Sequence, residues 1–147
     1  MPDFNQAEDA LYTMVKGVLD NEADCKKLPV YWPGKDASVE PDVNQPYVVV
    51  INTLLTNAPE TLGREAIWRA EGNLIVRFIF GEAQGEYDRW HQVALKLNSA
   101  FQARATGSGV YVMDVRRAVT TVSSGRYMID VLVTYYFRDS SNVRRRA

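Results

Sequence analysis

The chain has 147 residues, which is the usual size of one domain with a single hydrophobic core. Its 46% of hydrophobic residues is ordinary for a globular protein, and no segment approaches the ~18 consecutive apolar residues of a membrane helix. The acidic, amphipathic N-terminus is unlike a signal peptide, so we expect a soluble protein that stays in the cytoplasm of the cell that makes it, with no membrane partner. A single cysteine, Cys25, excludes an intramolecular disulfide and a cysteine-rich zinc site.

The formal net charge is −1, but the charges are unevenly distributed. Residues 1–42 hold nine acidic residues and four lysines, whereas all twelve arginines lie at or after Arg64. Such a division gives opposite potentials to different faces of one domain, which favours head-to-tail association of copies or docking onto a charged assembly. Scattered, solvated charge is the other interpretation.

The first half of the chain predicts one helix and two extended segments. Apolar residues at helical spacing predict an amphipathic helix from residue 4 to about residue 20, with Asp3 as its N-cap. Prolines at either side of residues 28–33 predict a short edge strand or a turn, and an exposed loop follows. The β-branched run at 46–55, PYVVVINTLL, predicts a central strand covered on both faces, and residues 57–63 predict a polar connection.

Residues 64–101 predict a hairpin followed by a helix. Period-two alternation over 64–70 and 74–80 predicts two strand arms, and Glu71-Gly72-Asn73 between them offers the positive φ angles of a tight turn. Beyond the second arm the spacing changes to three and four, which predicts a helix that ends at the glycines 107 and 109. We expect this helix to lie across the apolar face of the hairpin. Its apolar stripe is Tyr87, Trp90, Ala94, Leu97 and Phe101.

Two further strands, at 110–122 and 127–137, predict a second hairpin. The expected fold class is α+β, a mostly antiparallel sheet with two amphipathic helices packed on one face. We expect one domain over residues 1–137 and a basic, flexible C-terminal tail over residues 138–147.

The search for catalytic chemistry finds no complete set of partners. His91 could act as a general base with Asp88 about one turn away, or it could be a boundary residue of an amphipathic helix. Cys25 has neither a second histidine nor a flanking signature to activate it. The carboxylates show no metal-ligand spacing, and FGEAQGEYD lacks the lysine and Ser/Thr of a phosphate loop. We therefore expect no catalytic residue, no metal and no cofactor.

The arginines are more informative than the other polar residues. Arg69 and Arg77 each interrupt an apolar strand, so their side chains should lie on the solvent side of the sheet, at an edge or at a subunit contact. The tail, RDSSNVRRRA, could contact nucleic-acid phosphates or order against a protein partner. Sequence-specific binding of DNA is not expected, because neither predicted helix has a basic face.

In the order and spacing of its pieces, the chain resembles the phage tail terminator family, small proteins that cap the tail tube of long-tailed phages. The likeness extends from the first helix to the last strand. The matching pieces are the N-terminal amphipathic helix, the segment VYWPGKD (Val30, Trp32), the strand PYVVV (Pro46, Tyr47), the arm RAEG (Arg69, Gly72), the strand LIVRFIFG, and the helix that closes on Leu97 and Phe101.

This resemblance implies an assembly function without catalysis. Copies would form a hexameric ring on the last ring of tail tube protein, end its polymerisation and present a joining surface to the head-neck or connector protein. The protein would lie at the head-proximal end of the virion tail, and DNA would pass through the lumen without sequence-specific binding. A ring with repeated head-to-tail contacts suits the uneven charge. The expected contacts are sheet edges and the hairpins around Gly72 and Ser124, with Trp68, Arg69, Arg77, Arg138, Arg144, Arg145 and Arg146 as candidate residues.

Two alternatives stay open. Another neck or tail-completion protein of similar fold would differ only in the partner that it binds. A small enzyme is the alternative from a different class, and it predicts that His91→Ala loses activity without loss of fold.

Overall fold

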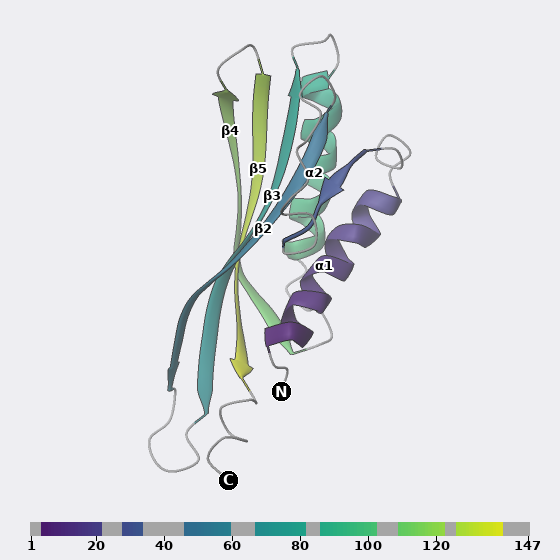
Figure 1. Ribbon diagram of the computed structural model, residues 1–147. Coiled ribbons are helices and arrows are strands. Elements are labelled where there is room, and N and C mark those ends of the chain that lie inside the picture. The colour runs from purple at the N-terminus through teal and green to yellow at the C-terminus, as the bar shows by residue number, and fades with distance from the viewer. Residues whose placement is uncertain are drawn as a thin grey trace.

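The computed structural model describes residues 4–21, 28–33, 46–59, 67–81, 86–102, 109–122 and 126–139. These residues form the helices α1 (Phe4–Asp20) and α2 (Glu86–Gln102) and the strands β1 (Val30–Tyr31), β2 (Tyr47–Pro59), β3 (Trp68–Gly81), β4 (Val110–Val122) and β5 (Arg126–Asp139). The strands make one sheet in the order β1-β2-β3-β5-β4, in which only the short β1 pairs in parallel with its neighbour. The predicted α+β class is confirmed (Figure 1).

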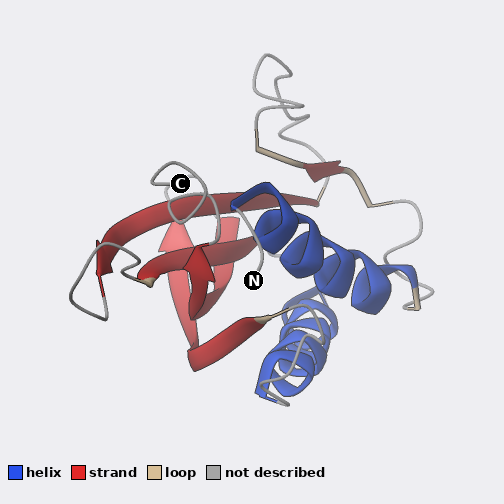
Figure 2. Cartoon of the chain, turned by 90° about the horizontal axis from the view of Figure 1, so that it is seen from below, coloured by secondary structure: helices blue, strands red, loops and turns tan. Residues whose placement is uncertain are grey.

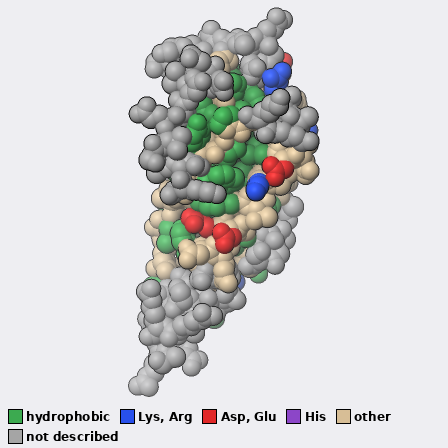
Figure 3. Space-filling model, turned by 45° about the vertical axis from the view of Figure 1, so that its right-hand side comes forward, with side chains coloured by type: hydrophobic (Ala, Val, Ile, Leu, Met, Phe, Trp, Pro, Cys, Tyr) green, Lys and Arg blue, Asp and Glu red, His purple; other side chains and the backbone are tan. Residues whose placement is uncertain are grey.

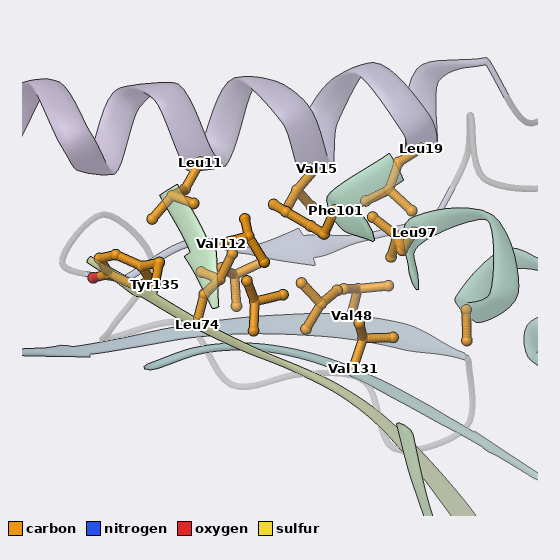
Figure 4. Close-up of a cluster of buried hydrophobic side chains, with 14 of the residues drawn as sticks. Leu11, Val15, Leu19, Val48, Leu74, Leu97, Phe101, Val112, Val131 and Tyr135 are labelled. Carbon is orange, nitrogen blue, oxygen red and sulfur yellow. The ribbon is translucent and has the colours of Figure 1, made fainter. Parts of the chain in front are cut away.

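Both helices cover the same face of the sheet, as predicted (Figure 2). The apolar stripe of α1 recurs every four residues, and it packs with the stripe of α2 on alternate residues of β3 and β5 (Figure 4). Full burial of one large aliphatic or aromatic side chain contributes about 1.5–3 kcal/mol, so this face supplies most of the stability. The largest fully buried side chains include Leu11, Val15, Leu74, Phe78, Phe80, Leu97, Phe101, Ile129, Tyr135 and Phe137.

The predicted tight turn at Glu71-Gly72-Asn73 is wrong. These residues lie inside β3, where Gly72 is paired with Leu54 of β2 on one side and with Tyr135 of β5 on the other. A Cβ atom added to Gly72 would lie 2.5 Å from the Tyr135 hydroxyl, so the glycine makes room for a ring and does not reverse the chain. The connection between β2 and β3 falls in residues 60–66, outside the described residues.

The predicted strand at 46–55 lies inside the sheet, between β1 and β3, but the prediction that it is covered on both faces is wrong. The helices bury Val48 and Val50, but every residue of β2 from Thr53 onward is exposed. The strand continues to Pro59, so the predicted polar connection begins within β2. Figure 1 shows this end of β2 extending away from both helices. An uninterrupted β-branched run therefore did not indicate cover on both faces.

The short edge strand predicted within residues 28–33 and the hairpin predicted for residues 110–137 are both confirmed. The Pro29 carbonyl accepts a hydrogen bond of 2.9 Å from the Val48 amide, and β1 then pairs with β2 for two residues. β4 and β5 pair antiparallel along their length, with a register shift between Val112 and Asp114. Gly109, with a φ of 84°, directly precedes β4.

Several predictions concern segments outside the described residues. These are the Asp3 N-cap, Cys25, most of the loop before residue 46, Gly107, the turn at Ser124 and residues 140–147 of the tail. Arg138 and Asp139, which were assigned to the tail, belong to β5. Within the described ranges, neither helix has the length and hydropathy needed to cross a membrane.

Candidate functional site

Neither of the two described helices lies on one face of the sheet, and we call this face the open face. Its residues alternate with the buried residues of β2, β3 and β5, and cross-strand register places them side by side. Aliphatic side chains cluster at its centre, and each is only half-buried. An uncovered sheet face with this composition is a candidate surface for another protein. The cluster consists of Val49, Ile51, Ile75, Ile79, Met128 and Leu132.

Arg77, one of the predicted contact residues, lies at the centre of the open face. Its guanidinium forms an ion pair within the sheet. Its Nε and one terminal nitrogen donate hydrogen bonds of 2.9 and 3.1 Å to the two carboxylate oxygens of Asp130, which is its direct partner in the β3–β5 register. The Asp130 side chain is 12% exposed and the Arg77 side chain 30%. The hydrogen bonds raise the pKa of Arg77 above its usual value, although burial acts in the opposite direction. This pair neutralises charge in the middle of the aliphatic cluster.

The other predicted arginine, Arg69, lies at the far end of the same face. Its guanidinium is 3.9 Å from the centre of the Tyr136 ring, and its Nε is 3.1 Å from a carboxylate oxygen of Glu71. One terminal nitrogen also lies 3.5 Å from the Met113 sulfur. Arg69 therefore connects β3 with β5 and β4 through side chains.

The structure brings only some of the predicted contact residues together. Arg69 and Arg138 are direct partners across β3 and β5, while Arg77 lies eight residues along β3, roughly 26 Å away. Trp68 shares the strand parity of the buried residues, so it lies on the opposite face from these arginines. Arg144, Arg145 and Arg146 lie outside the described residues.

A polar cluster between α1 and the sheet was not predicted. The Tyr135 hydroxyl donates a hydrogen bond of 2.5 Å to the Asn52 side-chain oxygen, and the Asn52 amide donates one of 3.0 Å to the Glu8 carboxylate. Tyr12 donates to the same Glu8 oxygen at 3.2 Å. The sequence offered one sign of this cluster: Asn52 is a polar residue at a position of β2 whose alternate neighbours are buried. Its partners could not be predicted, because they come from distant parts of the chain.

Burial shapes the acid–base behaviour of both tyrosines in this cluster. It raises the pKa of Tyr135 from 10.0 to about 12, and burial together with the neighbouring Glu8 carboxylate raises the pKa of Tyr12 as well. Both hydroxyls therefore stay neutral to a higher pH than an exposed tyrosine does. The cluster is suited to fixing α1 on the sheet rather than to proton transfer near neutrality.

Alkaline pH should destabilise the fold through Tyr135. Because the folded pKa lies above the unfolded value, the stability linked to this group is complete below pH 10 and is lost as pH rises from 10 to about 12. We expect the free energy of unfolding to fall by up to about 1.4 kcal/mol per pH unit in that window. Denaturant titrations of the wild type and of Tyr135→Phe measure this, and an equally steep alkaline loss in Tyr135→Phe would assign the effect to other groups.

A groove lies beside α1, on the helix side of the molecule. Its volume is about 570 Å³, and the ring centres of Tyr12 and Trp32 in its wall are 5.2 Å apart. Figure 3 turns this side forward and shows hydrophobic side chains in its middle, with acidic and basic side chains beside them. No histidine or cysteine is among the described lining residues. These lining residues are Asp9, Tyr12, Thr13, Lys16, Trp32 and Pro33.

The single histidine lies against an aromatic ring of its own helix. His91 is half-buried on α2, and its ring is stacked on Tyr87 with ring centres 5.7 Å apart. Its Nδ1 is buried without a hydrogen-bond partner among the described residues, whereas Asp88 is exposed. The ring position fits a boundary residue of the helix. In the described part of the chain, no three His, Cys, Asp or Glu side chains gather as a metal site requires.

Comparison with known proteins adds information on the fold only. No protein-family model matches the chain, and no curated protein matches its sequence. A solved structure whose name states no function superposes with a TM-score of 0.66, over 93% of this chain and 96% of that one. The two sequences are 15% identical, so this similarity is one of fold.

Proposed function

We propose that this chain is a structural assembly protein of the phage tail terminator type. Copies form a hexameric ring on the end of the tail tube, stop the tube protein from polymerising further, and present a joining surface to the neck or connector protein. The observation that carries the proposal is the open face, because a half-buried aliphatic cluster around a neutralised ion pair suits a contact between protein subunits.

The charges of the described elements support contacts between unlike surfaces. The exposed side of α1 carries Asp9 and Asp20 with one lysine, Lys16. The ends of the open face carry Arg69, Arg126 and Arg138 with one carboxylate, Glu71, so each side keeps an excess of one sign. Opposite potentials on different sides of one domain favour head-to-tail association, which closes into a ring when the rotation between copies is right. DNA passes through the lumen of such a ring without sequence-specific contacts.

The alternative is another neck or tail-completion protein with the same fold. Such a protein would also use an open sheet face, so its partner decides between the two functions. A terminator binds the growing end of the tail tube, whereas a neck protein binds the connector.

The proposal is tested by native mass across a wide concentration range, imaging of the largest species, and addition of the protein to growing tail tubes. We expect a closed ring that halts tube growth. Arg69→Glu should weaken ring formation severalfold, while Lys96→Glu, an equal charge change on the exposed side of α2, should not. Rings that leave tube growth unchanged, and bind a connector instead, would contradict the terminator function.

A further inference from the structure

The sheet has two edges that no described strand covers. β1 pairs with β2 only at Val48 and Val49, so the same side of residues 51–56 has no described strand beside it. β4 is last in the strand order, so one side of residues 111–122 likewise has no described strand beside it. Uncovered edges offer backbone N–H and C=O groups for pairing with another chain.

Exposed apolar side chains mark both edges at the same level of the sheet. Leu54 pairs with Gly72, Gly72 with Tyr135, and Tyr135 with Val112, so one cross-strand row leads from edge to edge. At the β2 end of this row, Leu54 is 42% and Leu55 53% exposed. At the β4 end, Tyr111 is 45% and Met113 42% exposed. Four of the six exposed large apolar side chains of the described residues therefore lie where this row meets an edge.

Strand directions and charges make the two edges compatible with each other. β2, β3, β5 and β4 are successively antiparallel, so β2 and β4 run in opposite directions. A second copy related by rotation about a ring axis would present its β2 antiparallel to β4 of the first, with the helices of both copies on one side. Residues 51–56, INTLLT, carry no charge, whereas β4 pairing with β4 would bring Arg116 and Arg117 near like charges.

We propose that residues 51–56 of one copy pair as an antiparallel strand with β4 of the next copy, so that neighbouring sheets join. Leu54 and Leu55 pack against Tyr111 and Met113 across this contact. Each copy keeps one edge of each kind, so the contact is heterologous and closes a ring when the rotation between copies is right. This inference rests on the proposed function and names the ring contact that the function requires.

Disulfide trapping tests the contact directly. In a Cys25→Ser background, Leu55→Cys is combined with Met113→Cys or with Tyr111→Cys, and the protein is oxidised and run under denaturing, non-reducing conditions. Paired strands bring the Cα atoms within the ~7 Å that a disulfide spans, so we expect a ladder of covalent oligomers that ends at the ring. The control combines Leu55→Cys with Val119→Cys, which is 44% exposed but six residues further along β4, roughly 20 Å away.

The outcomes separate this inference from the proposed function. Rings that cap tail tubes without any ladder would overturn the strand contact and leave the function standing. A ladder from protein that does not halt tubes would support the contact and reject the function. Absence of linkage at every concentration, or equal linkage in the Val119→Cys control, overturns the contact. Leu55→Lys should also lower the native mass without changing the melting temperature, and Val119→Lys should leave both unchanged.

Discussion

Gly72→Ala should lower the free energy of unfolding by about 3 kcal/mol, which is large for the addition of one methyl group. The new Cβ would lie 2.5 Å from the hydroxyl oxygen of Tyr135, 2.7 Å from its Cζ and 2.9 Å from the backbone carbonyl of Thr53. Tyr135 is fully buried and its hydroxyl is bonded to Asn52, so the ring cannot move aside without loss of that contact. The carbonyl of Thr53 belongs to β2 and moves only with the strand.

Urea denaturation of Gly72→Ala and Gly17→Ala provides the measurement and its control. Gly17 lies within α1, and an added Cβ there meets no atom within 4 Å. Alanine at that position should stabilise the protein by up to about 1 kcal/mol through helix propensity. If both substitutions changed stability by the same amount and in the same direction, close packing at Gly72 would not be the cause.

Periodicity predicted much of this fold, because it reports which side of each element meets the core. The alternation from Leu74 to Phe80 identified the buried side of β3, and the spacing from Trp90 to Phe101 identified the buried stripe of α2. Tyr87 was assigned to that stripe and its ring does contact those of Phe80 and Tyr127 on the sheet, but its side chain is 42% exposed. The pattern therefore gave the class of fold and its buried side.

Local sequence could not show whether Gly72 forms a turn or makes room for a neighbouring side chain. Glu71-Gly72-Asn73 has the composition of a tight turn, and only the position of Tyr135, on a strand far along the chain, makes the glycine a packing residue. The sequence of β2 is a second example, because its β-branched run did not indicate how much of the strand the helices cover. Tertiary contacts decided both cases.

The sequence predicted which arginines lie on the candidate surface, but not which side chains they contact there. The sequence placed Arg69 and Arg77 away from the core, and the strand parity of the structure agrees. Their partners Tyr136 and Asp130 depend on the β3–β5 register, which joins residues more than fifty positions apart. The Glu8–Asn52 contact depends equally on how α1 lies over the sheet. No local pattern encodes such pairings.

Asp130→Ala should destabilise the protein by about 2 kcal/mol, because it leaves the partly buried guanidinium of Arg77 without its two acceptor oxygens. The estimate lies below that for a fully buried pair, since Arg77 is 30% exposed and water can solvate part of its charge.

Asp114→Ala is the control for Asp130→Ala, and both are measured by denaturant unfolding. Asp114 pairs with Arg116, whose side chain is 79% exposed, so its loss should change stability by less than about 0.5 kcal/mol. Arg77→Leu combined with Asp130→Leu should recover most of the stability lost in Asp130→Ala, because it removes both charges and extends the aliphatic cluster. Equal effects of Asp130→Ala and Asp114→Ala would contradict this account. They would mean that the open face is as well solvated as the edge of β4, and its candidacy as a subunit contact would weaken accordingly.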